Sequence, residues 1–351
     1  MRSKIKILVI RFSSFGDVIQ ALSIASVLKK KFPESEIHWV TLNSFVSFCE
    51  THKAIDHVWS LKKSDGKRGL KKLTQVLKSE NFTHIYDAHN SVRSLLITSS
   101  LRGLLGFKGF FKGIHYLRRS RYPLRRFFLF RLRINLYPKP FVGQWALMEP
   151  LKKWGVDITL PEVPQVFLRE KDLKRAQKYL RTTALVNSVK VALSPSASYE
   201  LKRWPTQHWI DLVKQNKNID FILLGGPEDD FISQIQTSSE SNTLNLSGKL
   251  SFEESSSVIQ FCDALISSDT GLMHIGEQLG KPTIALMGPA PFGFPGRKST
   301  HVMELDLSCR PCSKHGQGPC TNKVYQKCLV EISPKEVSLE LNKILLKDIQ
   351  P

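Results

Sequence analysis

A short stretch near the C-terminal end limits most strongly what this chain can fold into. Within residues 262–289, an apolar run, the turn sequence Ser-Ser-Asp-Thr-Gly, a helical pattern and a second apolar run follow one another directly. This order predicts a βαβ unit, whose first loop lies at the carboxyl end of a parallel strand and whose helix start attracts anions. Thr270 and Gly271 there suit a phosphate, whereas Asp269 suits a hydroxylated group or simply caps the helix.

The same order of elements opens the chain. Residues 5–10 are a nearly continuous apolar run, typical of a buried parallel strand, and Arg-Phe-Ser-Ser-Phe-Gly-Asp and a helical pattern follow. The loop lacks a G-x-G-x-x-G pattern, so it carries no dinucleotide fingerprint. Asp17 lies where the loop meets the helix. It either caps that helix or places a carboxylate at the end of the sheet where open α/β folds hold their ligands.

Strand and helix patterns alternate through most of the chain. Strands are predicted at 36–42, 55–61, 84–87, 189–193, 221–224 and 243–246, and helices at 43–50, 69–78, 92–101, 144–154, 171–180, 252–261 and 335–347. Such alternation is typical of α/β folds with parallel sheets covered on both faces. The length of 351 residues favours two domains.

Other polar segments follow predicted strands. Residues 194–205 bring hydroxyls and the cations Lys202 and Arg203 directly after a strand, a composition that suits a pyrophosphate. Lys202 would neutralise charge on a leaving phosphate, unless it is an ordinary surface lysine. Glu228, in Gly-Gly-Pro-Glu after another strand, is placed to accept hydrogen bonds from a ribose. Arg93, in the helix that follows Asp-Ala-His-Asn, either meets an anionic acceptor or is solvated.

Positive charge is concentrated in the first part of the chain. Residues 1–140 carry 27 Lys and Arg against 8 Asp and Glu, whereas residues 141–351 carry 24 against 23. Such a field favours nucleic acid, an anionic membrane surface or a phosphorylated glycolipid as the partner.

Residues 118–133 carry seven arginines interleaved with aromatic residues and leucines. This composition suits a lipid interface, with arginines on phosphates and Phe127, Phe128 and Phe130 at the acyl boundary. It equally suits single-stranded nucleic acid or an ordinary basic surface helix. We favour the lipid interface because no recognised nucleic-acid module is present, and we expect no nucleic-acid partner.

The remaining composition limits the compartment and the metal chemistry. No apolar run reaches the length of a membrane span and no signal peptide precedes the first strand, so a cytoplasmic protein is expected. The last four of the six cysteines have the spacing C-x2-C-x7-C-x7-C around His315. They are weak candidates for a structural zinc site and are otherwise reduced thiols. These four are Cys309, Cys312, Cys320 and Cys328.

Four blocks together resemble the ADP-heptose lipopolysaccharide heptosyltransferases, glycosyltransferase family 9, over nearly the whole chain. They are 7–19 (ILVIRFSSFGDVI), 196–205 (SAS through KRWP), 223–228 (LLGGPE) and 268–274 (SDTGLMH). The resemblance implies the GT-B fold, in which two Rossmann-like domains with parallel sheets face a central cleft. We expect an acceptor domain at 1–155, a linker at 156–168, a nucleotide-sugar domain at 169–332 and a C-terminal helix at 333–351 that packs back on the first domain.

The resemblance also assigns roles to residues. Asp17 matches the family's catalytic base and Lys202 its phosphate-binding lysine, which counts with Asp17 as catalytic. The implied donor-binding residues are Ser196, Ser198, Glu228, Asp269, Thr270, Gly271 and His274. Ser13, Ser14, Gly16 and Arg93 are the candidates on the acceptor side. Ser198 stands where some relatives have threonine, which keeps the hydroxyl. The clustered cysteines resemble those of the branch that adds the second heptose.

The implied reaction is a single displacement with inversion, in which a heptose moves from ADP-heptose to the inner core of lipopolysaccharide. No cofactor is required. The implied partners are the nucleotide sugar, a phosphorylated lipid A-core acceptor and the anionic inner membrane of a Gram-negative bacterium, with the enzyme peripheral on its cytoplasmic face. Two alternatives stay open. One is a GT-B transferase with another sugar or acceptor, and the other is a basic membrane- or nucleic-acid-binding protein without enzymatic activity on the same scaffold.

Overall fold

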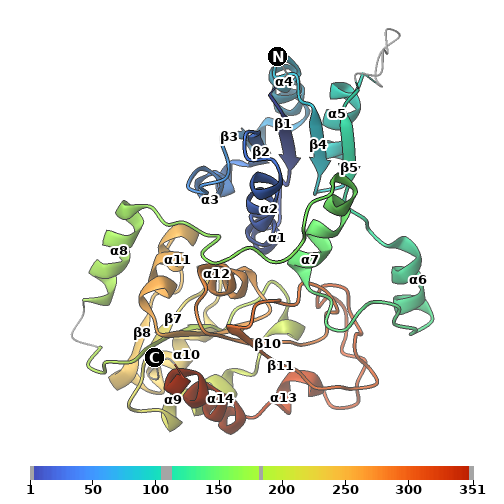
Figure 1. The fold of residues 1–351 in the computed structure, drawn as a ribbon. Coiled ribbons are helices and arrows are strands. Elements are labelled where there is room, and N and C mark those ends of the chain that lie inside the picture. The colour runs from blue at the N-terminus through green and yellow to red at the C-terminus, as the bar shows by residue number, and fades with distance from the viewer. Residues whose placement is uncertain (1–3, 104–112, 182–184, 348–351) are drawn as a thin grey trace. The chain divides into compact units, whose positions relative to one another are not determined.

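The computed structural model of the chain describes residues 4–103, 113–181 and 185–347, which fall into two compact units (Figure 1). Unit 1 takes Met1–Leu124 and Gly143–Phe167, and unit 2 takes Arg125–Val142 and Leu168–Pro351. Each unit is built on one parallel sheet with helices, which confirms the predicted α/β class. The last four residues of the predicted C-terminal segment 333–351 lie outside the described residues.

The sheet of unit 1 has the order β3-β2-β1-β4-β5, and all its strands are parallel. The strands are β1 (Lys6–Ile10), β2 (Glu36–Leu42), β3 (His57–Leu61), β4 (His84–Asp87) and β5 (His115–Arg118). After β1 the chain builds outward to β3, then returns to the other side of β1 and builds outward to β5. The end of β1 is therefore the point at which the strand order reverses, where doubly wound sheets bind ligands.

The core of unit 1 forms because apolar residues of β1 and β2 meet the apolar face of α4. Leu70, Leu73 and Leu77 lie on one face of that helix, and all three are buried in a cluster with Leu8 and Val40. The helices are α1 (Phe15–Ala21), α2 (Ser23–Lys31), α3 (Val46–Glu50), α4 (Gly66–Ser79), α5 (Val92–Leu101) and α7 (Gly143–Met148). Three-residue 3-10 turns precede α3 and α4, and a longer one, Glu149–Trp154, follows α7.

The sheet of unit 2 has the order β11-β10-β9-β6-β7-β8, again fully parallel. The strands are β6 (Lys190–Ser194), β7 (Asp220–Leu223), β8 (Thr243–Asn245), β9 (Ala264–Ser268), β10 (Thr283–Leu286) and β11 (Thr300–Met303). Numbered from β6, this is the strand order of a dinucleotide-binding fold, with the reversal between β6 and β9. The predicted βαβ unit at residues 262–289 is confirmed as β9, α12 and β10.

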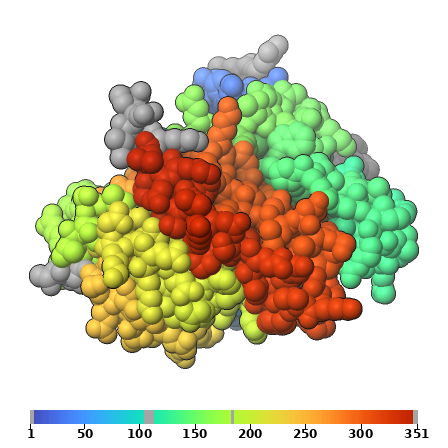
Figure 2. All heavy atoms as spheres, turned by 90° about the horizontal axis from the view of Figure 1, so that it is seen from below, coloured from blue at the N-terminus to red at the C-terminus, as the bar shows by residue number. Residues whose placement is uncertain are grey.

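The C-terminal helix packs on unit 2, which differs from its expected return to the N-terminal domain. Val337, Leu341 and Ile344 of α14 (Pro334–Lys347) belong to the buried cluster that contains Trp209 and Val213 of α9 (Thr206–Gln215). Figure 2 shows this helix in dark red across the surface of the yellow-green segments. The other helices of unit 2 are α8 (Glu170–Leu180), α10 (Phe231–Thr237), α11 (Phe252–Phe261), α12 (Gly271–Leu279) and α13 (Lys327–Val330).

Two predicted domain limits also differ from the structure. Residues 125–142 belong to unit 2, although they were assigned to an N-terminal domain at 1–155. Residues 156–167, assigned to a linker, belong to unit 1, and Val156, Ile158 and Val166 are buried. Gln165 accepts a hydrogen bond of 2.7 Å from Ser26, so this extended segment is fixed to α2 instead of being a free tether.

The arginine-rich segment 118–133 is helical only over α6 (Pro123–Arg131). Its first residue ends the edge strand β5, which the sequence patterns did not predict, and β11 and α10 were missed as well. Among the described residues, no helix is both long and apolar enough to cross a bilayer.

Candidate active site

Asp17 lies at the point of unit 1 where the strand order reverses. β1 ends at Ile10, the chain turns through residues 11–14, and α1 begins at Phe15, so Asp17 stands in the first turn of that helix. Oδ2 of Asp17 accepts hydrogen bonds from the hydroxyl of Ser14 at 2.8 Å and from its backbone N–H at 3.4 Å. Ser14, not Asp17, is therefore the N-cap of α1, and Asp17 takes part in a capping box as its N3 residue. The Asp17 side chain is 36% exposed.

Two arginines determine the charge state of Asp17. Nη2 of Arg11 lies 2.7 Å from Oδ2 of Asp17, and Nη1 of Arg119 lies 3.9 Å from Oδ1. Arg11 is only 3% exposed and donates a second hydrogen bond of 2.7 Å to the carbonyl of Ala88, which fixes its direction. Burial by itself would raise the pKa of Asp17, but Arg11, Arg119 and the Ser14 hydrogen bonds hold this pKa well below its usual range. Asp17 is therefore ionised at neutral pH.

The loop after β4 and the start of α5 place His89 and Arg93 against Phe12, which belongs to the turn before Asp17. His89 packs edge-on to the Phe12 ring with centroids 5.4 Å apart, and the guanidinium of Arg93 lies 5.3 Å from the same ring. Burial, followed by the charges of Arg11 and Arg93, lowers the pKa of His89 to about 4. Of the acceptor-side candidates, Ser14 contacts Asp17, Ser13 and Gly16 flank it in the same turn, and Arg93 lies against the neighbouring ring.

Asp87, at the end of β4, holds this loop in place. Its side chain is fully buried and accepts hydrogen bonds from the backbone N–H groups of His89 at 3.1 Å and Asn90 at 2.7 Å, and from the hydroxyl of Ser94 at 2.9 Å. Nε of Arg118 lies 3.4 Å from Oδ2 of the same carboxylate. A buried carboxylate with this set of partners has a positioning role.

In unit 2, the two segments singled out by sequence meet at an ion pair. Nζ of Lys202, in the 3-10 turn after β6, lies 2.7 Å from Oδ2 of Asp269, directly after β9. The two side chains are 17% and 8% exposed. β6 and β9 are neighbours in the sheet, and the hydroxyl of Ser268 donates a hydrogen bond of 3.1 Å to the carbonyl of Pro195, which joins the two loops. This ion pair thus stands at the carboxyl edge of the sheet.

The start of α12 lies directly beside this pair. The helix begins at Gly271 after the extended residue Thr270, so its first backbone N–H groups open next to Asp269. His274 is 4% exposed, and its Nδ1 lies 3.5 Å from Oε2 of Glu277. Glu277 is fully buried and accepts hydrogen bonds from the backbone N–H groups of Gly296 at 2.5 Å and Arg297 at 3.1 Å.

The other donor-side candidates lie at the same edge of the sheet. Ser196 is partly buried and Ser198 is exposed in the loop after β6, and Glu228 is exposed in the loop after β7, the next strand. Its neighbour Asp229 is buried and accepts a hydrogen bond of 2.7 Å from the backbone of Gly226. The structure therefore places Lys202 in contact with Asp269. Glu228 lies in the loop that follows β7, the strand next to β6.

A family model described as glycosyltransferase family 9 (heptosyltransferase) matches residues 70–325, well over half of the chain. The chain belongs to glycosyltransferase family 9. Lipopolysaccharide heptosyltransferase 2 of Escherichia coli K12 is 24% identical to it over 371 aligned positions, which cover 98% of this chain and 99% of that protein.

Solved structures agree with this assignment. A family 9 glycosyltransferase from Veillonella parvula has a TM-score of 0.79 at 20% identity, with 99% of each chain covered. The E. coli heptosyltransferase WaaC with ADP-2-deoxy-2-fluoro heptose has a TM-score of 0.65 at 19% identity, covering 97% of this chain and 99% of that one. The chain is a glycosyltransferase with the two-domain GT-B fold, as its resemblance to family 9 implied.

Sequence reasoning missed two contacts of this candidate site. The first is the Arg11–Asp17 pair, which a buried-strand pattern running directly into an arginine could have indicated. The second is the support that residues 309–328 give to the turn that carries Lys202. Gly316 of that segment approaches the side chain of Lys202 so closely that a Cβ there would lie 2.7 Å from Cγ. No signal in the sequence predicted this approach.

In the part of the chain that the structure describes, no three of the four clustered cysteines bring their sulfur atoms within 4.8 Å of one another. All four are free thiols, and burial raises the pKa of Cys328 to about 11. Four thiolates on one zinc ion lie about 4 Å apart, because each Zn–S bond is about 2.3 Å long. Among the described residues, the one group of three metal-binding side chains with ligand atoms all within 4.8 Å lies elsewhere. The zinc prediction gains no support from this geometry, and metal analysis of purified protein is its test.

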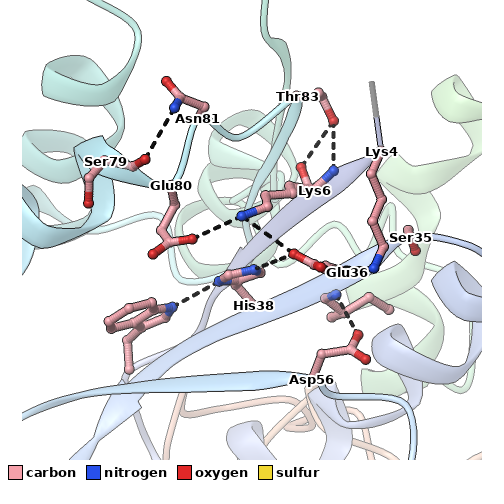
Figure 3. Close-up of polar contacts among 12 residues, drawn as sticks. Lys4, Lys6, Ser35, Glu36, His38, Asp56, Ser79, Glu80, Asn81 and Thr83 are labelled. Atoms are coloured by element: carbon pink, nitrogen blue, oxygen red, sulfur yellow. Dashed lines mark hydrogen bonds and ion pairs between the residues drawn. The ribbon is translucent and has the colours of Figure 1, made fainter. Parts of the chain in front are cut away.

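That other group is Glu36, His38 and His57, at the amino-terminal edge of the unit 1 sheet (Figure 3). Nε1–H of Trp59 donates to Nδ1 of His38 at 3.1 Å, so the proton of the neutral ring is on Nε2, the nitrogen 3.7 Å from Glu36. A metal on Nε2 would need a free lone pair there. Lys6 lies 3.4 Å from Glu36 and 3.1 Å from Glu80 and supplies the positive charge instead. We interpret this group as an ion-pair network.

Proposed function

We propose that this enzyme transfers a heptose from ADP-heptose to a phosphorylated inner-core acceptor of lipopolysaccharide, with inversion at the anomeric carbon. The observation that carries the proposal is the set of charged groups at the carboxyl edge of each sheet. Unit 1 presents an ionised Asp17 surrounded by arginines, and unit 2 presents Lys202 and the start of α12. The related WaaC, solved with an ADP-heptose analogue, supports ADP-heptose as the donor.

Asp17 acts as the general base. Its carboxylate takes the proton of an acceptor hydroxyl while that oxygen forms a bond to the anomeric carbon of the heptose. The bond from the anomeric carbon to the diphosphate oxygen breaks, and its electron pair leaves with ADP. Because Arg11 keeps Asp17 ionised, the base needs no separate deprotonation at neutral pH. Arg93 and Arg119 favour phosphate groups of the acceptor beside it.

Lys202 and the first N–H groups of α12 balance the charge that develops on ADP. Asp269 would repel phosphate, so we assign it to hydroxyls of the heptose. Ser196, Ser198, Thr270 and His274 contribute further contacts to the diphosphate, and Glu228 accepts from the ribose. With these cations in place, turnover does not depend on a divalent metal, and we expect it to persist in a chelator.

We further propose that the enzyme works on the cytoplasmic face of the inner membrane, held there by α6 and the residues after it. Residues 88–148 contain 12 Lys and Arg and no Asp or Glu. Leu124 is 73% exposed, Phe127 54% and Leu132 51%, and they alternate with the exposed Arg125 and Arg131. Exposed apolar side chains beside arginines are typical of helices that lie in a lipid headgroup layer.

Some side chains of the arginine-rich segment pack within unit 2. Phe130 packs against Phe292 with centroids 6.3 Å apart, and Arg126 lies over the same ring at 5.2 Å. Arg133 donates a hydrogen bond of 3.1 Å to the carbonyl of Pro311. These side chains fix the segment to unit 2. Of the three phenylalanines named for the acyl boundary, only Phe127 is exposed.

The decisive experiment is a transfer assay with ADP-heptose and a panel of truncated lipopolysaccharide cores. We expect one core to accept heptose and the released nucleotide to be ADP. Binding of UDP- or GDP-sugars in preference to ADP-sugars, or transfer to none of the cores, would contradict the proposal and favour another sugar or acceptor.

A further inference from the structure

The segment that carries the cysteines is bound to the turn that carries Lys202. The hydroxyl of Tyr325 donates to Oε1 of Glu200 at 2.8 Å, and Nε2 of Gln326 donates to the Glu200 carbonyl at 2.6 Å. Nε2 of Gln317 donates to the hydroxyl of Tyr199 at 2.8 Å. All three hydrogen bonds reach either Tyr199, the N-cap of this 3-10 turn, or Glu200, its first residue. One of them, from Gln326, holds the backbone of the turn from which Lys202 projects.

Gly316 meets the side chain of Lys202 itself. Its φ of +86° lies in the left-handed region, and a Cβ there would lie 2.7 Å from Cγ and 3.1 Å from Cδ of Lys202. Two hydrogen bonds hold the glycine in this place. Its N–H donates to the hydroxyl of Ser313 at 3.0 Å, and that hydroxyl donates to the carbonyl of Gln317 at 2.8 Å. The backbone of Gly316 is therefore held in place, and the aliphatic part of the Lys202 side chain packs directly against it.

The other end of Lys202 is fixed too. Its ammonium pairs with Asp269 at 2.7 Å, and only 17% of the side chain is exposed. The Lys202 side chain is thus restrained at its backbone and at its ammonium. A side-chain atom added at Gly316 would push Cγ and Cδ of Lys202 away and would move Nζ with them. A catalytic charge displaced by about 1 Å can cost roughly 100-fold in rate.

We propose that Gly316 is a positioning residue for the transfer reaction, in which the absence of its side chain sets the direction of Lys202 toward the leaving diphosphate. This inference rests on the proposed role of Lys202. Gly316 acts through the lysine and does not itself contact substrate.

The chain offers a matched control two residues away. Gly318 has a φ of +84°, nearly the same as Gly316, but a Cβ there would meet nothing within 4 Å. Gly316→Ala and Gly318→Ala therefore carry the same backbone strain, and only the first intrudes on Lys202. We expect Gly316→Ala to melt somewhat lower than Gly318→Ala, because its Cβ would also lie 3.2 Å from Cβ of Tyr199. Both variants are therefore assayed well below their melting temperatures. We expect ADP affinity and kcat to fall roughly 10- to 100-fold further in Gly316→Ala than in Gly318→Ala.

A double-mutant cycle tests whether the effect passes through the lysine. Lys202→Ala removes Cγ and Cδ, so adding Gly316→Ala to it should change ADP affinity little further, as measured by calorimetry. Equal losses in the two glycine variants, or an undiminished Gly316→Ala effect in the Lys202→Ala background, would overturn the inference. Normal ADP affinity and turnover in Lys202→Ala alone would instead overturn the proposed role of the lysine.

Discussion

The ammonium of Lys202 lies 2.7 Å from the carboxylate of Asp269, and both side chains are largely buried at the carboxyl edge of the unit 2 sheet. The proposed mechanism gives them different targets, a phosphate for the lysine and sugar hydroxyls for the aspartate. In the absence of donor, each therefore neutralises the charge of the other. Donor binding exchanges this pair for two sets of contacts with the nucleotide sugar.

Substitutions of the pair should separate these two roles. Lys202→Ala removes a charged partner of the diphosphate, so ADP affinity should fall roughly 10- to 100-fold. Asp269→Asn removes a charge that repels phosphate, so ADP affinity should hold or rise while turnover of the nucleotide sugar falls. Calorimetry with ADP and steady-state kinetics with the donor measure the two effects. A loss of ADP affinity in Asp269→Asn equal to that in Lys202→Ala would contradict the division of roles.

Asp17→Asn should lose most turnover, because the amide cannot take the proton of the acceptor hydroxyl. We expect kcat to fall roughly 10²- to 10⁴-fold. Donor affinity should not change, since Asp17 belongs to unit 1 and the proposed donor residues to unit 2. Single-turnover transfer and ADP calorimetry on the same preparation test both statements. Turnover near that of the unaltered enzyme would remove Asp17 from the role of base.

The pH dependence should reveal the Arg11–Asp17 pair. Arg11 holds the pKa of Asp17 below its usual range, so protonation of Asp17 should cause no loss of kcat/KM between pH 5 and 8 (about one unit or more above the reference pKa). In Arg11→Met the desolvation that raises the pKa of Asp17 remains and the larger opposing cation is gone. The acid limb of kcat/KM should then move toward neutral pH, and an unchanged acid limb would show that Arg11 does not control this carboxylate.

His52 should make unit 1 sensitive to acid. It is 2% exposed, its Nδ1 accepts from the backbone N–H of Ala54 at 3.2 Å, and burial lowers its pKa to about 4. The unfolded chain takes up this proton near pH 6.5 and the folded one only near pH 4. Stability is therefore fully present above pH 6.5 and is lost as pH falls toward 4, by up to about 3 kcal/mol.

His52→Asn keeps an acceptor for Ala54 without a titrating ring. Urea unfolding at pH 7, 5.5 and 4.5 (steps of about one unit across the window) should show a smaller loss of stability in this variant. His315→Asn, at an exposed position of unit 2, is the control and should follow the unaltered protein. Identical pH profiles for all three proteins would show that His52 is not the group responsible.

Membrane binding should depend on the exposed face of α6. Arg125→Ala with Arg131→Ala removes about 1 kcal/mol per arginine at an anionic surface, so binding should weaken roughly 30-fold. Lys71→Ala with Lys72→Ala, on the exposed face of α4, removes the same charge from another surface and is the control. Flotation with vesicles of phosphatidylcholine and phosphatidylglycerol, compared with phosphatidylcholine alone, measures binding. Equal weakening in both pairs would mean that net charge and not α6 determines it.

Buried elements were predicted well because their patterns reflect local packing. The bounds of β2, β4, α5 and α11 agree with the predicted residues, and each of these elements carries an apolar pattern or a clear start signal. The strands that were missed, β5 and β11, are the outer strands of their sheets. An edge strand packs on one side only, so residues such as His115 and Arg118 can remain partly exposed and no apolar run forms.

The sequence predicted which segments contribute to the candidate site, but it did not predict which of their side chains contact one another. Asp17, Lys202 and Asp269 each follow a strand pattern, which placed them at the carboxyl ends of their sheets. Their partners depend on the order of the strands. Lys202 meets Asp269 because β6 lies beside β9, although 67 positions separate the two residues in the chain. Arg119, which reaches Asp17, directly follows β5, the strand that the sequence patterns missed.

The path of residues 125–142 limits which hybrids of two related enzymes can form by recombination. The chain leaves unit 1 after Leu124, packs Tyr137 and Phe141 against Phe292, and returns to unit 1 at Gly143. A hybrid of two relatives joined at one crossover near residue 167 would pair the ring cluster of one parent with the Phe292 loop of the other. Recombination should therefore exchange whole genes, or the 125–142 segment together with the second half, more readily than either half alone.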